Sequence, residues 1–424
     1  MLQRRTSMKI TSKNNKFTSN SKEKVKNTPL NNKQPPLKEQ LPQEQHSAFL
    51  LIHKGLESIA LQELEELKGI KGTAFPGEKD FSVIEFFANS LEDLTYLLNH
   101  LQSIRGLFLS VGYETSWKNF LTKDFHGSKF LFNQASFKIE IEGVSDLEER
   151  KEITSSLAGK IFDDYNHLDL KVDFKKAQVV ALICSIGSNY FFGWDLSGQE
   201  LHKRSFRVFP HQASFTGDIA YYLVRKVGFN KSNENSKLLV GLAKDSSIAL
   251  EAAVFLHHKK LYRTSYLLEK YPIFQKLALS SSSETTTESL EHSTTESAPD
   301  SDNNQLHIFA FDESNPNYVA SRKNIKIAGL STTIDLNKYS LDELELKYGD
   351  NIFRWAIFHF TSKDEEKINE VYYQLNLILK KSGQVLFVCR KNWDLPISDR
   401  FELLEKEELT RGESTLNLWL LRKK

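Results

Sequence analysis

Apolar residues in the N-terminal half follow two spacings, one typical of strands and one of helices. Within residues 46–115, the short apolar runs AFLLIH, FSVIEFF and GLFLSVGYE predict three strands. Two helical patterns lie between them, and Gly69 is placed to end the first helix. The apolar residues of that first pattern are Leu56, Ile59, Ala60, Leu64 and Leu67. The order strand–helix–strand–helix–strand predicts a small α+β unit.

A second α+β unit is predicted for residues 116–201. Its alternating strand FKIEIEG is followed by the helix ERKEITSSLAGKIFDDYN and by the segments LDLKVDF, QVVALICSIG and NYFFGWDLSG. From Pro210 onward strands and helices take turns, and each helix is long enough for a crossover. Repeated β-α-β units predict a parallel sheet with helices on both faces. The final segment, ESTLNLWLLRKK, predicts one more strand at the edge of that sheet.

Two segments of the 424-residue chain have an unusual composition. Residues 1–45 hold ten Lys or Arg, three acidic residues and few large apolar ones, which predicts a disordered basic tail. Residues 280–304 hold six acidic residues and no Lys or Arg, which predicts a disordered acidic insert in the C-terminal domain. The two segments nearly cancel within a formal net charge of +1, so bulk charge does not indicate a nucleic-acid partner.

The apolar content excludes other classes of protein. No run approaches the 18 or so apolar residues that a membrane helix needs, and residues 1–45 contain no apolar core of a signal peptide. Cys184 and Cys389 both lie in apolar stretches and are interpreted as small core residues. We therefore expect a cytoplasmic protein without a membrane partner.

The most specific chemical signal is DLSGQELHKRSFRVFPHQA, residues 195–213. Cations next to aromatic side chains can neutralise phosphates and stack on unpaired bases. By composition alone, a solvated charged hairpin is the favoured interpretation. The cations of this segment are His202, Lys203, Arg204 and Arg207, and its aromatic residues are Phe206 and Phe209.

This segment resembles the signature D-x-S-G-x-x-L-H-K-R-G-Y-R, which joins the THUMP and methyltransferase domains of enzymes that make N2-methylguanosine in rRNA or tRNA. The matching residues are Asp195, Ser197, Gly198, Leu201, His202, Lys203, Arg204 and Arg207. The resemblance extends over about residues 46–424. It implies a ferredoxin-like domain at 46–115, a THUMP RNA-binding domain at 116–201 and a Rossmann-like methyltransferase domain at 202–424. It also implies S-adenosylmethionine as methyl donor and structured RNA as partner, with RNA contacts from His202, Lys203, Arg204 and Arg207.

The donor-binding residues that the resemblance implies are largely replaced. The pattern A-P-L-x-E-x-L-A, which borders the donor pocket, is ASFTGDIA here, residues 213–220. In the loop D-P-x-C-G-S-G-T, Val240 replaces the aspartate, and Lys244 and Ser246 replace the two glycines. Glycine is needed there because the donor crosses the backbone too closely for a Cβ. The favoured interpretation is a loop that no longer serves a ligand. The acidic residue implied for the donor ribose is kept as Asp312, which would equally serve as a helix cap.

The catalytic motif Asn/Asp-Pro-Pro-Tyr is replaced by His359-Phe360-Thr361-Ser362. His359 is a degenerate catalytic position that can accept one hydrogen bond when neutral. Three hypotheses follow: an RNA-binding protein with weak or no catalysis, an active RNA methyltransferase with divergent motifs, or a scaffold for another RNA-processing protein. Because no C-x-x-C, H-E-x-x-H or P-loop string is present, we expect no metal site.

Overall fold

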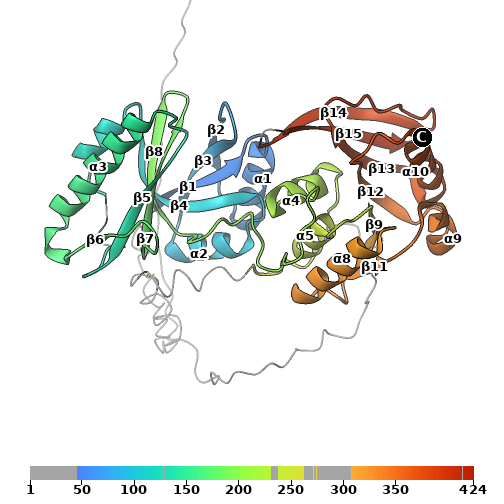
Figure 1. The fold of residues 1–424 in the computed structure, drawn as a ribbon, viewed down its shortest axis with the longest axis horizontal. Coiled ribbons are helices and arrows are strands. Elements are labelled where there is room, and N and C mark those ends of the chain that lie inside the picture. Colours follow the sequence, from blue (N-terminus) through green and yellow to red (C-terminus); the bar gives the residue numbers. More distant parts are fainter. Residues whose placement is uncertain are drawn as a thin grey trace, which may run out of the picture. The chain divides into compact units, whose positions relative to one another are not determined.

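Two β-sheets form the framework of this computed structural model (Figure 1). The structure describes residues 45–125, 127, 130–230, 237–261, 271, 274, 307–412 and 414–424. The predicted acidic insert lies outside these residues, as does the predicted basic tail except for its last residue. Both therefore stay predictions.

The N-terminal half is built on one eight-stranded sheet, in the order β2-β3-β1-β4-β8-β7-β5-β6. Its strands are β1 (His46–His53), β2 (Gly72–Phe75), β3 (Phe81–Ala88), β4 (Ile104–Glu114), β5 (Ser136–Glu142), β6 (Lys171–Val172), β7 (Val179–Ile186) and β8 (Asn189–Asp195). Its helices are α1 (Glu57–Lys68), α2 (Leu91–His100) and α3 (Leu147–Asp164), with short 3₁₀ helices η1 (Trp117–Thr122) and η3 (Asn166–Leu168). Strand β2 was not predicted.

Strand β4 pairs with strand β8, so the two predicted α+β units share a single sheet. The pairing is antiparallel and runs from Phe108 opposite Asp195 to Glu114 opposite Tyr190. The predicted end of α1 is confirmed: Gly69 has a φ of 66°, and its N–H donates to the carbonyl of Glu65 at 2.8 Å.

The C-terminal half contains a seven-stranded sheet in the order β11-β10-β9-β12-β13-β15-β14. Its strands are β9 (Lys237–Gly241), β10 (Ile308–Phe311), β11 (Ile334–Asn337), β12 (Phe353–His359), β13 (Leu379–Arg390), β14 (Phe401–Arg411) and β15 (Ser414–Lys423). Its helices are α4 (Gly217–Lys226), α5 (Ser247–Leu256), α8 (Asn315–Ile327), α9 (Leu344–Tyr348) and α10 (Glu365–Ile378), with the 3₁₀ helix η4 (Leu341–Glu343). The neighbouring strands β11, β10, β9, β12 and β13 are parallel, as predicted.

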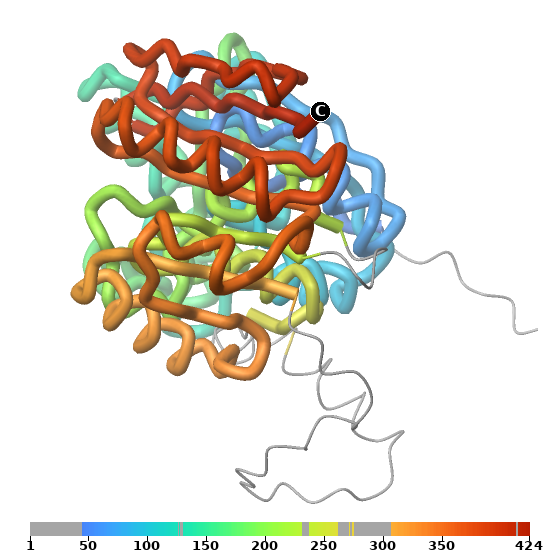
Figure 2. Tube along the Cα trace, turned by 90° about the vertical axis from the view of Figure 1, so that its right-hand side faces the viewer, coloured from blue at the N-terminus to red at the C-terminus, as the bar shows by residue number. Residues whose placement is uncertain are grey.

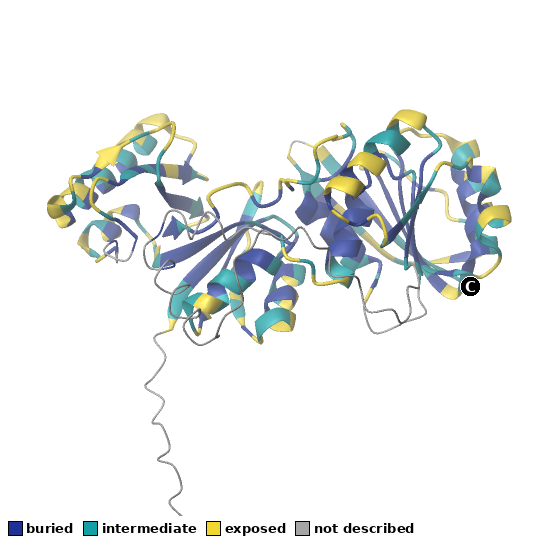
Figure 3. Cartoon of the chain, turned by 90° about the horizontal axis from the view of Figure 1, so that it is seen from below, coloured by how far each residue is buried: buried dark blue, intermediate teal, exposed yellow. Residues whose placement is uncertain are grey.

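Successive residues of the central strands of the second sheet enter opposite cores, so these strands are buried on both faces (Figure 3). In β9, Leu238 and Val240 belong to the core formed with α4, α5 and α8, whereas Leu239 belongs to the core formed with α9 and α10. The predicted placement of helices on both faces is confirmed. Cys184 and Cys389 are buried and free, as expected of core residues.

The C-terminal hairpin differs from the prediction. The last segment, β15, is not the edge strand: it lies between β13 and β14 and pairs antiparallel with both. Strand β14, which was not predicted, forms the edge. In Figure 2 this hairpin lies at one side of the sheet and β11 with α8 at the other.

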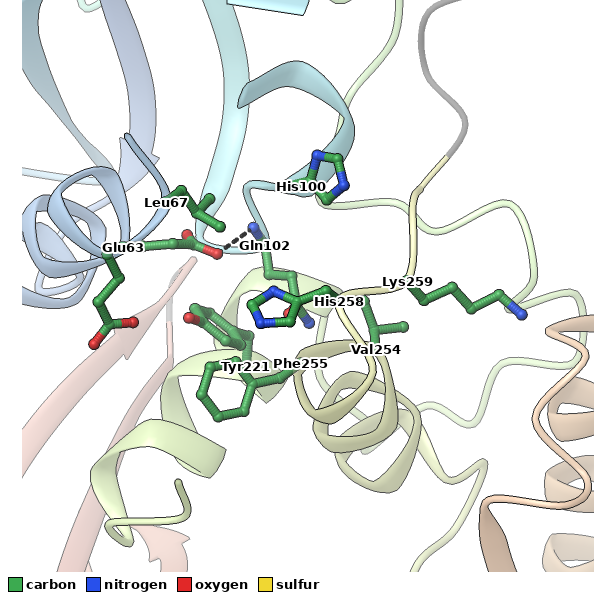
Figure 4. A pocket seen from close by; sticks show the side chains of 10 residues that line it. Glu63, Leu67, His100, Gln102, Tyr221, Val254, Phe255, His258 and Lys259 are labelled. Carbon is green, nitrogen blue, oxygen red and sulfur yellow. Dashed lines mark hydrogen bonds between the residues drawn. The ribbon is translucent and has the colours of Figure 1, made fainter. Parts of the chain in front are cut away.

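A buried ion pair connects the two halves. The Nε and Nη2 atoms of Arg204 donate to the two carboxylate oxygens of Glu251 in α5, at 2.7 and 2.9 Å. Nη2 also donates to the carbonyl of Gln102 at 2.7 Å, and the Gln102 side-chain amide donates to Glu251 Oε2 at 2.7 Å. Figure 4 shows Gln102 between Glu63 of α1 and the side chains of α4 and α5; its backbone N–H donates to Glu63 at 2.8 Å.

Gly217 makes room for the Arg204 guanidinium. A Cβ on Gly217 would lie 2.3 Å from Arg204 Nε, so no other residue fits there without moving the ion pair. Gly217 N–H also donates to the carbonyl of His202 at 2.9 Å, which fixes the start of α4 against the connecting segment.

Replacing Arg204 should destabilise the fold strongly. We expect Arg204→Ala to lower the free energy of unfolding by about 3–5 kcal/mol, because Glu251 would stay buried without its partner. Urea unfolding followed by tryptophan fluorescence measures this. The matched control is Lys203→Ala: that side chain is 67% exposed, and we expect a change within about 0.5 kcal/mol. Equal losses in both variants would contradict the prediction.

Candidate functional site

The strand order of the second sheet reverses between β9 and β12. Strand β10 continues the sheet on one side of β9, and β13 continues it on the far side of β12. In open α/β sheets, ligands bind in the crevice outside the carboxyl ends of the strands at such a reversal. The strands end here at Gly241 and His359. The structure therefore brings together the two places where the sequence suggested a donor loop and a catalytic motif.

The loop between β9 and α5 has the backbone shape that glycine favours, although it contains no glycine. Leu242, Lys244 and Ser246 have φ values of 54°, 56° and 61°. This left-handed conformation costs an L-residue roughly 1–2 kcal/mol. Neighbouring elements hold it: Lys244 N–H donates to Asp312 Oδ2 at 2.8 Å, and Ser321 Oγ donates to the Lys244 carbonyl at 2.8 Å.

The side chain of Lys244 lies buried in the crevice. Its Nζ donates to the carbonyl of His359, the last residue of β12, at 2.8 Å, and to the carbonyl of Leu242 at 3.3 Å. Burial disfavours the ammonium and lowers the pKa of Lys244 to about 8, although Asp312 and Asp245 favour its charge. The residues present do not fit the amino-acid end of S-adenosylmethionine, because an ammonium group of the protein already takes these carbonyls.

Asp312 follows β10, as predicted, and its carboxylate is occupied by the protein. Oδ2 accepts from Lys244 N–H, and Oδ1 accepts from Ser314 N–H at 2.9 Å and from Asn317 Nδ2 at 3.1 Å. These bonds shape the turn before α8, but the N-cap of α8 is Ser314 and no side chain caps the helix, so Asp312 is not a helix cap. A contact of Asp312 with a donor stays a prediction.

His359 lies at the end of β12 beside a cleft and packs against Phe215, with 4.5 Å between ring centroids. Burial lowers the pKa of His359 well below its usual value, and Lys244, Arg411, His211 and Arg390 lower it further. The imidazole is therefore neutral at physiological pH.

The four predicted RNA-contacting residues have different surroundings. Lys203 is exposed and pairs with Glu200, whereas Arg204 has only 2% of its side chain exposed. His202 is buried, and Arg207 Nε donates to Asp245 Oδ2 at 2.7 Å. The expectation of one exposed basic cluster therefore needs correction, because three of the four side chains pack inside the protein. An RNA contact from Lys203 stays a prediction.

Asp245 is a structural residue of the site that the sequence did not reveal. It is fully buried in the β9–α5 loop, and its Oδ2 accepts from Arg207 Nε and from His211 N–H at 3.0 Å. Asn324 of α8 donates to the Asp245 carbonyl at 3.1 Å and also bonds both backbone groups of Phe209. These contacts tie residues 207–211 across the loop. The sequence shows the carboxylate but not its partner 38 positions earlier.

Solved structures of other proteins match this chain over most of its length. TrmN from Thermus thermophilus has 16% identity and a TM-score of 0.63, covering 89% of this chain and 99% of its own. A possible methylase from Clostridium difficile 630 has 14% identity and a TM-score of 0.67, covering 90% of this chain and 99% of its own. The chain has a methyltransferase fold. SMU.472, solved in complex with SAH, gives a TM-score of 0.63 at 14% identity and covers 90% of this chain and 98% of its own.

These low identities establish the fold alone, so the predicted Rossmann-like methyltransferase fold is confirmed. The ferredoxin-like and THUMP designations stay predictions. No protein-family profile matches the chain, and no curated protein sequence matches it significantly. Within the described residues, no helix has the length and apolar content to span a bilayer, and no group of three or more His, Cys, Asp or Glu side chains could hold a metal ion.

Buried neutral histidine should make the stability of the fold depend on pH. Burial lowers the pKa of His202 to about 4, whereas an unfolded histidine titrates near about 6.5. Below about pH 6.5 the unfolded chain binds a proton that folded His202 refuses, so stability falls towards pH 4 by at most about 1.4 kcal/mol per pH unit. Burial raises the pKa of Asp195 to about 6, so this residue makes the folded protein more stable as the pH falls. The effect of His202 is therefore measured by comparing variants with wild type.

We expect His202→Asn to reduce the loss of unfolding free energy between about pH 7 and pH 5. Urea unfolding at several pH values measures this. His167→Asn, which changes an exposed histidine, is the matched control and should keep the wild-type dependence. An unchanged dependence in His202→Asn would show that the pKa of His202 is the same in the folded and unfolded protein, which contradicts the prediction.

Proposed function

We propose that this chain is an RNA-binding protein of the guanine-N2 RNA methyltransferase type that transfers no methyl group. The observation that carries the proposal is the hydrogen bond from Lys244 Nζ to the carbonyl of His359 at 2.8 Å. This bond puts a protein ammonium in the crevice where ligands of open α/β sheets bind. A donor would have to displace a buried side chain and leave its charge without those partners.

The RNA partner is supported by the signature-like segment 195–207 and by an exposed loop between β6 and β7. In that loop Phe174 is 72% exposed and is flanked by the exposed residues Lys171, Lys175 and Lys176. Asp173 Oδ1 accepts from the backbone N–H groups of Lys175 and Lys176 at 2.8 and 3.0 Å, which shapes the loop. An exposed aromatic ring with adjacent lysines suits an unpaired base and its phosphates. We infer that the partner is structured RNA, either rRNA or tRNA.

The donor should bind only after the Lys244 side chain is removed. Isothermal titration with S-adenosylmethionine should give no saturable heat with wild type, a dissociation constant weaker than about 1 mM. Lys244→Gly should bind measurably, because glycine removes the ammonium and tolerates the φ of 56°. Ser246→Gly is the matched control: it restores the other glycine but leaves the crevice filled, and it should behave as wild type.

Wild type should also transfer no label from methyl-labelled donor to total RNA. Donor binding by wild type in the low micromolar range, lost in Asp312→Ala, would contradict the blocked crevice. Stoichiometric labelling of RNA that disappears in His359→Ala would favour the active-enzyme hypothesis instead.

RNA binding should depend on the β6–β7 loop. With a fluorescent RNA stem-loop, Lys175→Ala/Lys176→Ala should flatten the log–log dependence of affinity on salt by about 1.4–1.8, because each lost phosphate contact removes about 0.7–0.9. Phe174→Ala should weaken binding by about 1–3 kcal/mol through lost stacking. Lys326→Ala/Lys381→Ala removes two exposed lysines of the second half and is the matched control. If both double variants bind with the wild-type salt dependence, the loop has no role.

A further inference from the structure

A second cleft opens beside the crevice, outside the carboxyl ends of β12 and β13. Its volume is about 840 Å³, within the range of about 300–1,000 Å³ usual for small-molecule sites. Its walls come from the end of β12, the end of β13 and the residues after it, the end of β14, the start of β15 and residues 212–213. The Lys244 side chain closes the neighbouring crevice but is not among the residues that line this cleft. The cleft adjoins the crevice at His359, whose carbonyl receives Lys244 and whose side chain lines the cleft.

The charge of the cleft wall is positive. Among the described residues that line it, Arg390, Lys391 and Arg411 are cationic and none is acidic. Lys391 is partly neutralised by Glu408 at 2.8 Å. Arg390 is exposed at the end of β13 and forms no ion pair within the described part of the chain. Among the described residues, two guanidinium groups therefore line this space and no carboxylate does.

The hydrogen bonds that hold Arg411 go to neutral groups. Its Nη2 donates to the carbonyl of Ser214 at 2.8 Å, and its guanidinium lies 5.4 Å from the ring centroid of Phe215. Burial and the neighbouring Arg207 lower the pKa of Arg411, whereas Asp245, which is already paired with Arg207, favours its charge. A half-buried cation that has no ion pair of its own within the described residues is stabilised by an approaching anion, and a guanidinium presents paired N–H groups to phosphate oxygens.

His359 marks where these charges converge. The cations Lys244, Arg411 and Arg390 all act on its ring, which lines the cleft, while the ring itself stays neutral. A neutral imidazole can donate one hydrogen bond to an oxygen. The site thus combines two guanidinium groups, one imidazole and the aromatic residue Phe360.

We propose that this cleft binds the phosphate group of a nucleotide through Arg390 and Arg411. The size of the cleft exceeds that of an inorganic anion and fits a nucleotide. The phosphate is supplied either by a strand of bound RNA, in which case the site rests on the proposed RNA-binding function, or by a free nucleotide. Both sources present the same phosphate group, and competition with the bound oligonucleotide distinguishes them.

The test compares Arg390→Ala and Arg390→Glu with Arg422→Ala. Arg422 is a half-buried arginine of β15 that pairs with Glu402 and lies outside the cleft lining, so it is the matched control. The first probe is a fluorescent single-stranded oligouridylate of about 12 nucleotides, a length within usual single-strand sites. The other two probes are adenosine monophosphate and adenosine, which are used as competitors and in direct titration. Thermal unfolding of each variant establishes that it is folded.

We expect Arg390→Ala to weaken oligonucleotide binding several-fold and to flatten its salt dependence by about 0.7, the loss of one phosphate contact on a single strand. Arg390→Glu should weaken it further, and Arg422→Ala should match wild type. Competition by adenosine monophosphate but not by adenosine identifies a free nucleotide as a ligand. If neither compound competes and Arg390→Ala still weakens oligonucleotide binding, the RNA strand is the source of the phosphate.

Failure of the cleft and failure of the proposed function have different signatures. If both Arg390 variants bind as wild type while Lys175→Ala/Lys176→Ala loses affinity, the cleft proposal is wrong and the RNA-binding function stands. If no RNA binds but adenosine monophosphate binds in an Arg390-dependent way, the cleft proposal stands alone. If wild type binds neither probe, both proposals are wrong.

Discussion

The buried pairing of Arg204 with Glu251 is the interaction on which the rest of the arrangement depends. A guanidinium out of water needs nearly all of its N–H groups bonded, and here Glu251 and the carbonyls of Leu201 and Gln102 accept them. These acceptors come from three separate parts of the chain, so satisfying one side chain fixes the connecting segment between the two sheets. This packing requires glycine at position 217, because any Cβ there would displace the guanidinium. The segment then continues over the β9–α5 loop, where Asp245 receives Arg207.

Much of the fold was predictable because buried parallel strands and crossover helices leave a strong pattern in the sequence. The strands that were missed are those for which burial is weak or the segment is short. Strand β14 reads FELLEKEELTR and is mostly exposed at the sheet edge, so charged residues mask its spacing. Strands β2 and β11 have four residues each, too few for a period to be recognised. The position of β15 depends on pairing across the hairpin, which spacing along the chain does not encode.

The candidate site was predictable in its location and not in its electrostatics. Motif spacing placed Lys244, Asp312 and His359 at the ends of the correct strands. It could not tell which cations are paired inside the protein, because Glu251 lies 47 positions after Arg204. Sequence proximity made the segment 202–207 look like one basic surface, whereas Arg204 and Arg207 turn inward to Glu251 and Asp245. The basic cleft was missed for the converse reason, since Arg390 and Arg411 are far apart in sequence and meet only through the hairpin.

The pairing of β4 with β8 has a consequence for how the protein would select an RNA. The β4–β8 ladder, which is irregular between Ser110 and Gly112, crosses the predicted boundary near residue 115, so the β6–β7 loop and β1 belong to the same sheet. The ion pair of Arg204 and Glu251 joins this sheet to the second one. An RNA that contacts both the loop and the cleft must present phosphates to both at once, so the protein would select its partner by shape.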